Sequence, residues 1–295
     1  MYDFSRCTLC PRECGADRTK TAGICGCDCR IRAAKAQLHY WEEPCISGRN
    51  GSGAVFFSGC TLKCCFCQNH EISSENKGME ISTQRLGEIF LELQQKGAHN
   101  INLVNPTHYV PQIITALDLV KDRLTIPVVY NCGGYEKEET LRILEGYVDI
   151  YLPDFKYVSA EISGKYSGAA DYCQYAEKAL KEMHRQQPKL VMEGNMLRKG
   201  LIVRHLILPG CRHDSIAAVN RLAEILPRNS FLLSLMSQYT PNENCGEYPE
   251  INRRITTFEY KSVLKEVQRL DIKGFSQERT SAKSEYTPDF DFSGL

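Results

Sequence analysis

Two patterns of apolar residues alternate along the chain from residue 53 onward. Short runs that are apolar on both faces are typical of buried parallel strands, whereas apolar residues recurring every three or four positions are typical of amphipathic helices. The predicted strands are GAVFFSG, NINLVN, IPVVYN, VDIYLPD, GLIVRHLILPG and FLLSLMSQY. The predicted helices cover residues 82–95, 110–122, 138–144, 169–185, 214–226 and 257–270. Six alternating strand–helix units predict an α/β fold with a parallel sheet covered by helices.

Residues 1–50 lack this periodicity and are rich in cysteine, glycine and charged residues. We therefore expect a small Cys-rich metal-binding segment over residues 1–50, a main fold over residues 51–275 and a C-terminal tail over residues 276–295. The sequence shows no internal repeat and no low-complexity linker.

Composition and charge narrow the function. The 295-residue chain has a formal net charge of zero and no long basic or acidic block, so we expect no binding to nucleic acid or a membrane surface. No stretch reaches the ~18 apolar residues of a membrane span. The first residues lack the pattern of a secretory signal, which predicts a cytoplasmic, reducing location. Most of the fifteen cysteines lie between Cys7 and Cys67, and clustered thiols in a reducing compartment indicate metal binding.

Cys60, Cys64 and Cys67 form a C-x3-C-x2-C triplet directly after the first predicted strand. Three thiolates at this spacing can hold three corners of an iron–sulfur cubane and leave the fourth iron without a protein ligand. A vacant position indicates metal chemistry, because a substrate can bind there. The alternative is a zinc knuckle, but zinc prefers four ligands in paired spacing. Because adjacent residues of an extended chain face opposite sides, we expect Cys65 to point away from the cluster.

A second group of cysteines lies near the N-terminus. Cys7, Cys10, Cys14 and Cys25 supply four thiolates, which would make a closed site. Either an auxiliary [4Fe–4S] cluster or structural zinc fits four thiolates, and the sequence leaves both open.

Several motifs together resemble one protein family. They are CTLCPRECG, HYWEEPCISG, GSGAVFFSGCTLKCCFCQNHEIS, NPTHYVP, LPDFKY and RHLILPG. These strings resemble the radical S-adenosylmethionine (radical SAM) superfamily, and within it the PflX-like relatives of pyruvate formate-lyase activating enzymes. The resemblance covers nearly the whole chain and includes Phe66, the aromatic residue before the last cysteine of the triplet. It implies a partial (β/α)6 TIM-type barrel, a [4Fe–4S] cluster on Cys60, Cys64 and Cys67, and S-adenosylmethionine (SAM) on the open iron.

Ligands of parallel α/β folds gather at the C-terminal ends of strands, so the residues there are candidates for SAM binding. Asn105 follows the second predicted strand, where many radical SAM enzymes carry a Gly-Gly-Glu-like turn that this chain lacks. Asn131 ends the third strand at a position where the activating enzymes carry an acid. Asp154 and Lys156 follow the fourth strand; their spacing by two lets both point into the barrel mouth, with an ordinary salt bridge as the alternative.

The last two strands contribute two more candidates. Arg204 matches the arginine of the Arg-x-x-x-x-Pro-Gly strand of the activating enzymes, which serves the SAM ribose or carboxylate. A lone arginine among apolar neighbours also needs an anionic partner if it is buried. Tyr239 would approach the adenine, or else pack in the core. His108 is either a base or SAM contact or a polar residue at a loop–helix junction. The sequence assigns no role to Cys132, Cys211 or Cys245, and no catalytic side chain.

The resemblance implies an enzyme that reductively cleaves SAM to a 5′-deoxyadenosyl radical, which abstracts hydrogen from a glycine of a glycyl radical enzyme. Its expected electron donor is a flavodoxin or ferredoxin. One alternative is modification of another peptide or a small molecule by the same radical. A third hypothesis, a non-catalytic iron–sulfur electron carrier, does not explain why Asp154, Lys156 and Arg204 lie at strand ends.

Overall fold

A computed structural model describes residues 2–276 and 288–295 of the chain. Its strands are β1 (Ile31–His39), β2 (Ser52–Phe57), β3 (Met79–Ile81), β4 (Ile101–Val104), β5 (Val128–Cys132), β6 (Ile150–Pro153), β7 (Val191–Glu193), β8 (Met196–Leu206), β9 (Leu232–Met236) and β10 (Gly274–Ser276). Its α-helices are α1 (Pro44–Ser47), α2 (His70–Ser73), α3 (Thr83–Gln95), α4 (Val110–Val120), α5 (Glu138–Arg142), α6 (Ala160–Ser167), α7 (Tyr172–Gln186), α8 (Arg212–Ile225) and α9 (Thr257–Arg269).

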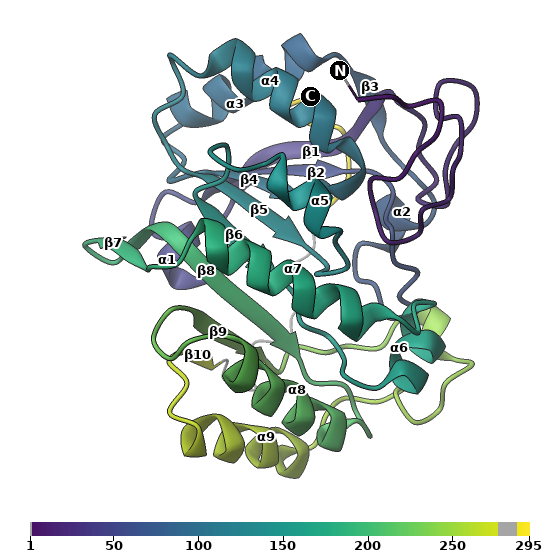
Figure 1. Cartoon of the computed structure of the whole chain (residues 1–295), viewed down its shortest axis with the longest axis vertical. Helices are drawn as coiled ribbons and strands as arrows, with labels where there is room; N and C mark the ends of the chain where they lie inside the picture. The colour runs from purple at the N-terminus through teal and green to yellow at the C-terminus, as the bar shows by residue number, and fades with distance from the viewer. Residues whose placement is uncertain (1, 277–287) are drawn as a thin grey trace.

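The strands form one sheet in the order β10-β9-β8-β6-β5-β4-β2-β1-β3, and β7 pairs with β8 (Figure 1). Neighbours from β2 to β9 pair in parallel, and these six strands are the six that the sequence predicts. The sheet is not closed, because it ends in β10 on one side and β3 on the other. The prediction of an open α/β fold around a parallel sheet is therefore confirmed.

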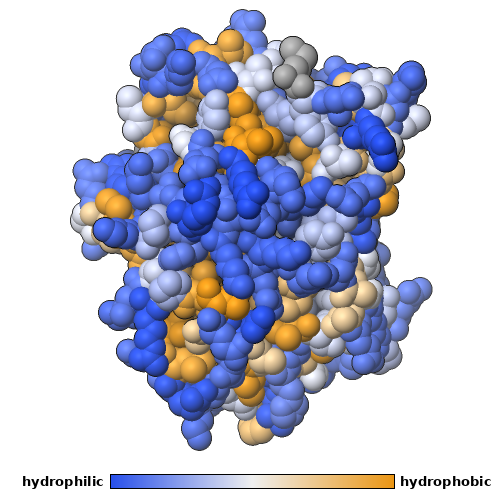
Figure 2. All heavy atoms as spheres, in the orientation of Figure 1, coloured by the Kyte–Doolittle hydropathy of each residue, from blue (hydrophilic) through white to orange (hydrophobic). Residues whose placement is uncertain are grey.

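Local sequence explains why the predicted helices form where they do. Ser82 caps α3, accepting a hydrogen bond of 3.0 Å from the backbone N–H of Arg85. The apolar stripe predicted for this helix is buried and consists of Leu86, Ile89, Phe90 and Leu93. In α9, Thr256 and Glu259 form a reciprocal capping box. Hydrophilic side chains cover much of the face that the helices form (Figure 2), so these helices bury one stripe and expose the other.

The expectation of little regular structure before residue 50 is wrong for residues 31–39. They form β1, which pairs antiparallel with β2 from Ala33 to His39. The segment IRAAKAQLH contains three alanines and a lysine, which have low strand propensity, so pairing with β2 decides its structure. The sequence also missed the three-residue strands and the four-residue helices, which are too short for periodicity to detect.

The two faces of the sheet bury different groups of residues. Helices α3 and α4 cover one part of the helix-bearing face, and α5, α7, α8 and α9 cover the rest (Figure 1). On the opposite face, Cys45 and Ile46 of α1 pack against Val129, Leu152 and Ile202. Helix α1 therefore packs on the face of the open sheet opposite the large helices, below the site described next.

None of the described helices is long and apolar enough to cross a lipid bilayer. Part of the predicted tail, residues 277–287, lies outside the described residues. Residues 288–295 are described, and Phe290 packs with Ala34 and Phe56 on the inner face of the sheet.

Candidate functional site

A cavity at the C-terminal ends of the parallel strands consists of two adjoining pockets that share a wall. The shared wall contains Cys64, Cys67, Asn69, Asp154, Lys156 and Arg204. Phe66, Gln238 and Tyr239 line one pocket, whereas Cys60, Asn105, Asn131 and Cys132 line the other. Apart from His108, the structure therefore brings together around one cavity the residues that the sequence suggested for SAM and for the cluster at Cys60, Cys64 and Cys67.

The loop that carries the three cysteines is held in place by polar contacts from the next strand–helix unit. Gly59 begins this loop with a φ of +84°, and a Cβ atom there would lie 2.8 Å from the Cys25 carbonyl oxygen. The side-chain amide of Asn105 donates to the Gly59 carbonyl. His108 Nε2 lies 2.7 Å from the Ser58 carbonyl oxygen. Asn105 and His108 thus fix the loop, and His108 lines neither pocket.

The three thiols of the triplet lie close enough to affect one another. Burial raises the pKa of Cys60 to about 12, and the neighbouring charges of Cys64 and Cys67 add to this rise. Three partly buried thiolates require a positively charged group between them, which is what iron atoms would supply. The residues present thus fit a cubane, whose thiolates bind different iron atoms. Among the described residues, no three His, Cys, Asp or Glu side chains are grouped to hold a single metal ion.

Cys65 lies outside the cavity. It is absent from both pocket linings and packs toward Cys245, whose Sγ is 3.9 Å from the Cys65 carbonyl oxygen. The two adjacent cysteines therefore face different surroundings, with Cys64 beside Lys156 and Cys65 beside Cys245.

Lys156 and Arg204 share Asp154 as a counter-charge. Lys156 Nζ lies 2.6 Å from Asp154 Oδ2, and Arg204 Nε lies 2.9 Å from Asp154 Oδ1. All three side chains are 16% exposed. Burial works against the charged form of Asp154, but Arg204 and Lys156 outweigh it and lower the pKa of this carboxyl. The two strands are adjacent, as β6 and β8 pair in parallel, and both cations face the same cavity.

Arg204 has further partners inside the protein. Its Nη1 lies 3.3 Å from Glu42 Oε2, and its Nη2 lies 2.5 Å from Asn131 Oδ1. The amide of Asn131 in turn donates to Glu42 Oε1 over 3.2 Å. Asn102 donates to the same oxygen over 2.9 Å. A closed polar network of Asp154, Arg204, Asn131, Asn102 and Glu42 therefore forms below the cavity.

Sequence reasoning missed Glu42 and Glu43. Glu42 completes the charge balance of the cavity wall, with Asp154 and Glu42 opposite Lys156 and Arg204. Glu43 is buried, and burial raises its pKa, with Arg204 opposing and Glu42 reinforcing that rise. The sequence feature that could have indicated them is the pair of glutamates in WEEP, directly before Pro44 at the start of α1. Asp154 and Glu42 are thus the anionic partners that a buried Arg204 was expected to need.

The aromatic candidates occupy the rim of one pocket. The rings of Phe66 and Tyr239 are 5.9 Å apart and both line the cavity. The Tyr239 hydroxyl donates to the Ile251 carbonyl over 2.8 Å, so it is directed into the core. Tyr239 can offer a ring surface to a ligand, but its hydroxyl already has a partner.

The N-terminal cysteines surround a buried arginine. Arg18 donates to the carbonyls of His108 and Asp28, and its Nη1 lies 3.8 Å from Cys7 Sγ. Among the ion pairs of the described residues, none joins Arg18 to a carboxylate. The charges of Cys25, Cys7 and Cys27 instead raise its pKa against the effect of burial.

Cys10 and Cys14 belong to the same thiol-rich region. Burial raises the pKa of Cys10 to about 12, and the charges of Cys25 and Cys7 also act on it. A Cβ atom on Gly23 would lie 3.3 Å from Cys14 Sγ and 3.6 Å from Cys25 Sγ. The metal site predicted on Cys7, Cys10, Cys14 and Cys25 stays a prediction.

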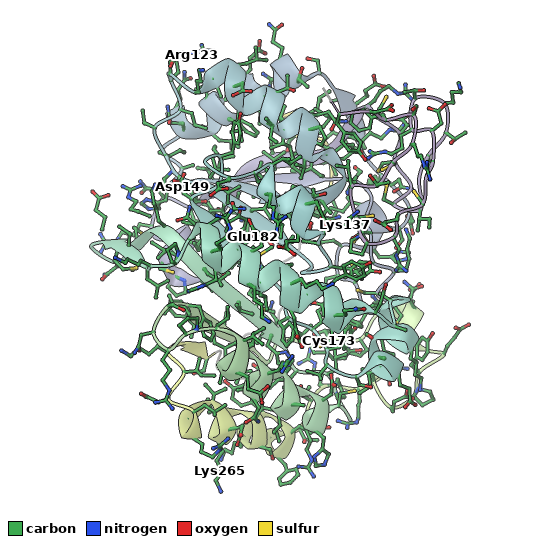
Figure 3. All side chains as sticks on the ribbon, viewed as in Figure 1. Arg123, Lys137, Asp149, Cys173, Glu182 and Lys265 are labelled. Carbon is green, nitrogen blue, oxygen red and sulfur yellow. The ribbon has the colours of Figure 1, made fainter. Side chains whose placement is uncertain are left out.

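This Cys-rich segment is attached to the cluster loop and the barrel. The Cys60 backbone N–H donates to the Cys25 carbonyl over 3.2 Å, and the Cys27 thiol contacts the Ser58 carbonyl over 3.2 Å. Lys137, labelled in Figure 3, pairs with Glu13 at 2.5 Å. The two cysteine groups of the sequence are therefore neighbours in space.

Comparison with known proteins identifies the domain. Residues 54–192 match the family model of the radical SAM superfamily. The chain contains a radical SAM domain. Members of this superfamily are enzymes, and the match of this domain implies a [4Fe–4S] cluster and SAM. A protein of Methanocaldococcus jannaschii whose function is uncharacterised is 27% identical over 285 residues, which cover 91% of this chain and 76% of that protein.

Several proteins of known structure share the fold at low sequence identity. Streptococcus suis SuiB, bound to its precursor peptide SuiA, is 15% identical with a TM-score of 0.51, covering 74% of this chain and 46% of SuiB. Methylornithine synthase is 16% identical with a TM-score of 0.51, covering 73% of this chain and 63% of that one. A radical SAM methyltransferase of Sphaerobacter thermophilus is 12% identical with a TM-score of 0.52, covering 77% and 66%. The chain thus spans 46 to 66% of the length of these proteins, and the likeness shows the fold alone.

We predict that Lys156→Ala weakens SAM binding with the cluster intact. Removing a buried cation opposite a carboxylate costs about 2–5 kcal/mol. Arg204→Ala should weaken SAM binding and also lower stability, because it leaves Glu42 and Asn131 without their partner. The measurement is SAM affinity of the reconstituted variants. Lys199→Ala, whose side chain is 56% exposed on the same strand as Arg204, is the control. Wild-type affinity in both Lys156→Ala and Arg204→Ala would contradict a SAM-binding role.

Proposed function

We propose that this chain is a radical SAM enzyme that cleaves SAM reductively and uses the 5′-deoxyadenosyl radical to abstract hydrogen, as an activase of a glycyl radical enzyme. The observation that carries the proposal is one cavity lined by the three cysteines of the triplet together with Asp154, Lys156 and Arg204. When bound by Cys60, Cys64 and Cys67, the cluster would supply one electron to the sulfonium of SAM and an open iron for the amino and carboxylate groups of SAM to chelate.

The side chains of the cavity have separate tasks in this proposal. Lys156 is the cation beside Cys64, so it is the group we assign to the SAM carboxylate. Asp154 holds both Lys156 and Arg204 in orientation through its two oxygens. Phe66 and Tyr239 offer ring faces on the adenine side. The chain thus binds and orients SAM, while the radical chemistry belongs to the cofactors.

The electron balance of the reaction requires two partners. One electron from a flavodoxin or ferredoxin would break the carbon–sulfur bond of SAM and give methionine and the deoxyadenosyl radical. That radical would take a hydrogen atom from the substrate and leave the substrate radical with 5′-deoxyadenosine. In the PflX-like assignment the substrate is a glycine Cα–H of a glycyl radical enzyme.

A second candidate is radical modification of a different peptide or of a small molecule. Asn131, bound to Arg204, replaces the acid expected in the activating enzymes, and Asn105 replaces their Gly-Gly-Glu-like turn. Among proteins of similar fold, SuiB was solved with a precursor peptide. An electron carrier would need no such cavity with charged walls, which disfavours that hypothesis.

The cysteine variants test reductive cleavage. We predict that reconstituted Cys64→Ala protein, given dithionite and SAM, forms no 5′-deoxyadenosine. Cys65→Ala should retain cleavage, because Cys65 contacts Cys245 rather than the cavity. The readout is chromatographic quantification of 5′-deoxyadenosine and methionine. Loss of cleavage in both variants, or in neither, would contradict the proposed cluster ligands. With a glycine-deuterated loop peptide from a candidate partner, an activase should also place deuterium in 5′-deoxyadenosine.

We also propose that the Cys-rich segment binds its own metal, because Cys7 Sγ lies 3.8 Å from buried Arg18 and the Cys14 and Cys25 thiols both lie beside Gly23. The variant with alanine at positions 60, 64 and 67 should retain iron or zinc on the purified protein. Elemental analysis measures the residual metal, and additional Cys7→Ala and Cys10→Ala substitutions should remove it. A folded triple-alanine variant without metal would refute the site.

A further inference from the structure

The described C-terminal residues, 288–295, lie along the edge of β1 (Figure 1). The Phe292 backbone N–H donates to the Ala34 carbonyl over 3.1 Å, and the Ala36 N–H donates to the Ser293 carbonyl over 3.0 Å. Strand β3 pairs with β1 only as far as Ala33, so the C-terminal residues occupy the next part of this edge. We call residues 288–295 the strap. It makes these two main-chain hydrogen bonds to the sheet edge, but it is not a regular strand, because Phe292 has a φ of +64° and residues 293–294 form a turn.

One aromatic side chain anchors the strap. Phe290 is 5% exposed, and its ring lies 5.7 Å from that of Phe56. The socket around it also includes Ala34, Ala54 and Ile72. Ile72 lines the cavity beside Cys60 and Cys67 as well. The socket is therefore separated from the candidate active site by one side chain.

The strap also meets a buried cation. The Lys35 side chain is 9% exposed, and its Nζ lies 2.6 Å from the Asp289 carbonyl oxygen and 3.0 Å from Asp291 Oδ1. A largely buried ammonium needs an anionic or carbonyl partner, so this position selects for an acid beside the aromatic residue.

Close approach of the strap to β1 depends on a glycine. Gly294 has a φ of +80°, and a Cβ atom there would lie 2.1 Å from the Ala36 carbonyl oxygen. Beyond the strap, a pocket bounded by Gln68, Glu71 and Lys77 extends along its side. Gln68 also lines the cavity, so the strap's surroundings are continuous with the site.

We propose that the edge of β1 beyond β3, the Phe290 socket and Lys35 form a docking groove for a peptide segment of a protein substrate, and that the strap occupies this groove until such a segment displaces it. The segment would carry an aromatic residue next to an acid, as the strap does in Asp-Phe-Asp. Only the identification of the incoming segment as a substrate rests on the proposed function.

The contacts of the strap are few enough for exchange. It buries one large side chain, makes two main-chain hydrogen bonds to β1 and contacts Lys35 through Asp289 and Asp291. A tethered segment competes at an effective concentration on the order of millimolar, so a weak intrinsic affinity suffices to keep it in place. A free peptide is therefore expected to bind the groove only when the contacts of the strap have been weakened.

Fluorescence anisotropy with a labelled peptide of residues 288–295 tests the groove on the full, cluster-reconstituted chain. Phe290→Ala weakens the chain's own strap, so this variant should bind the peptide at least tenfold more tightly than wild type. Phe292→Ala is the matched control, because Phe292 is 38% exposed and should leave binding at the wild-type level. Adding Lys35→Met to Phe290→Ala should abolish the gain in peptide affinity. Two variant peptides should not bind, one with alanine in place of the residue equivalent to Phe290 and one with alanine in place of the residue equivalent to Gly294.

Equal peptide binding to wild type and Phe290→Ala, or binding to neither, would overturn the groove. Circular dichroism and SAM cleavage of Phe290→Ala show whether that variant is folded and active. If it cleaves SAM but does not bind the peptide, the groove is wrong and the proposed function stands. If it binds the peptide while no form of the chain cleaves SAM, the proposed function is wrong and the groove stands.

Discussion

The rest of the site depends on how Arg204 is held between two carboxylates. Its guanidinium contacts Asp154 on one side and Glu42 on the other, with Asn131 completing its contacts. A buried cation is tolerated only when its charge and its hydrogen-bond donors are matched, and this set of residues matches them. Asp154, with its second oxygen free of Arg204, then directs Lys156 toward the thiol of Cys64.

This balanced wall joins parts of the chain that are distant in sequence. Glu42 precedes the first parallel strand, Asn131 ends β5, Asp154 follows β6 and Arg204 belongs to β8. The triplet loop contributes Cys64 and Cys67 to the same wall and is held by Asn105 and by the Cys-rich segment. In the proposed function, SAM would therefore meet a wall whose charges are already balanced.

Much of this arrangement was predictable from the sequence for identifiable reasons. Strands apolar on both faces signalled the six parallel strands, and residues at strand ends such as Asp154, Lys156 and Arg204 converge because parallel strands end at one edge. Glu42 was not predictable in this way, because it lies in a loop placed by long-range contacts. Strand β1 was not predictable because its sequence is rich in alanine. The packing of Phe290 on the sheet was not predictable because Phe290 is distant in sequence from the strands it contacts.

The charge balance around Arg204 is tested most directly by the unfolding free energies of Arg204→Met, Glu42→Gln and the double variant. Arg204→Met alone leaves Glu42 buried without a counter-charge and should destabilise the protein by about 3–5 kcal/mol. In the double variant Asp154 still has Lys156, so it should be more stable than Arg204→Met alone. If the loss of unfolding free energy in the double variant equals the sum of the losses in the two single variants, Arg204 and Glu42 are not coupled. The account of the cavity wall would then be wrong.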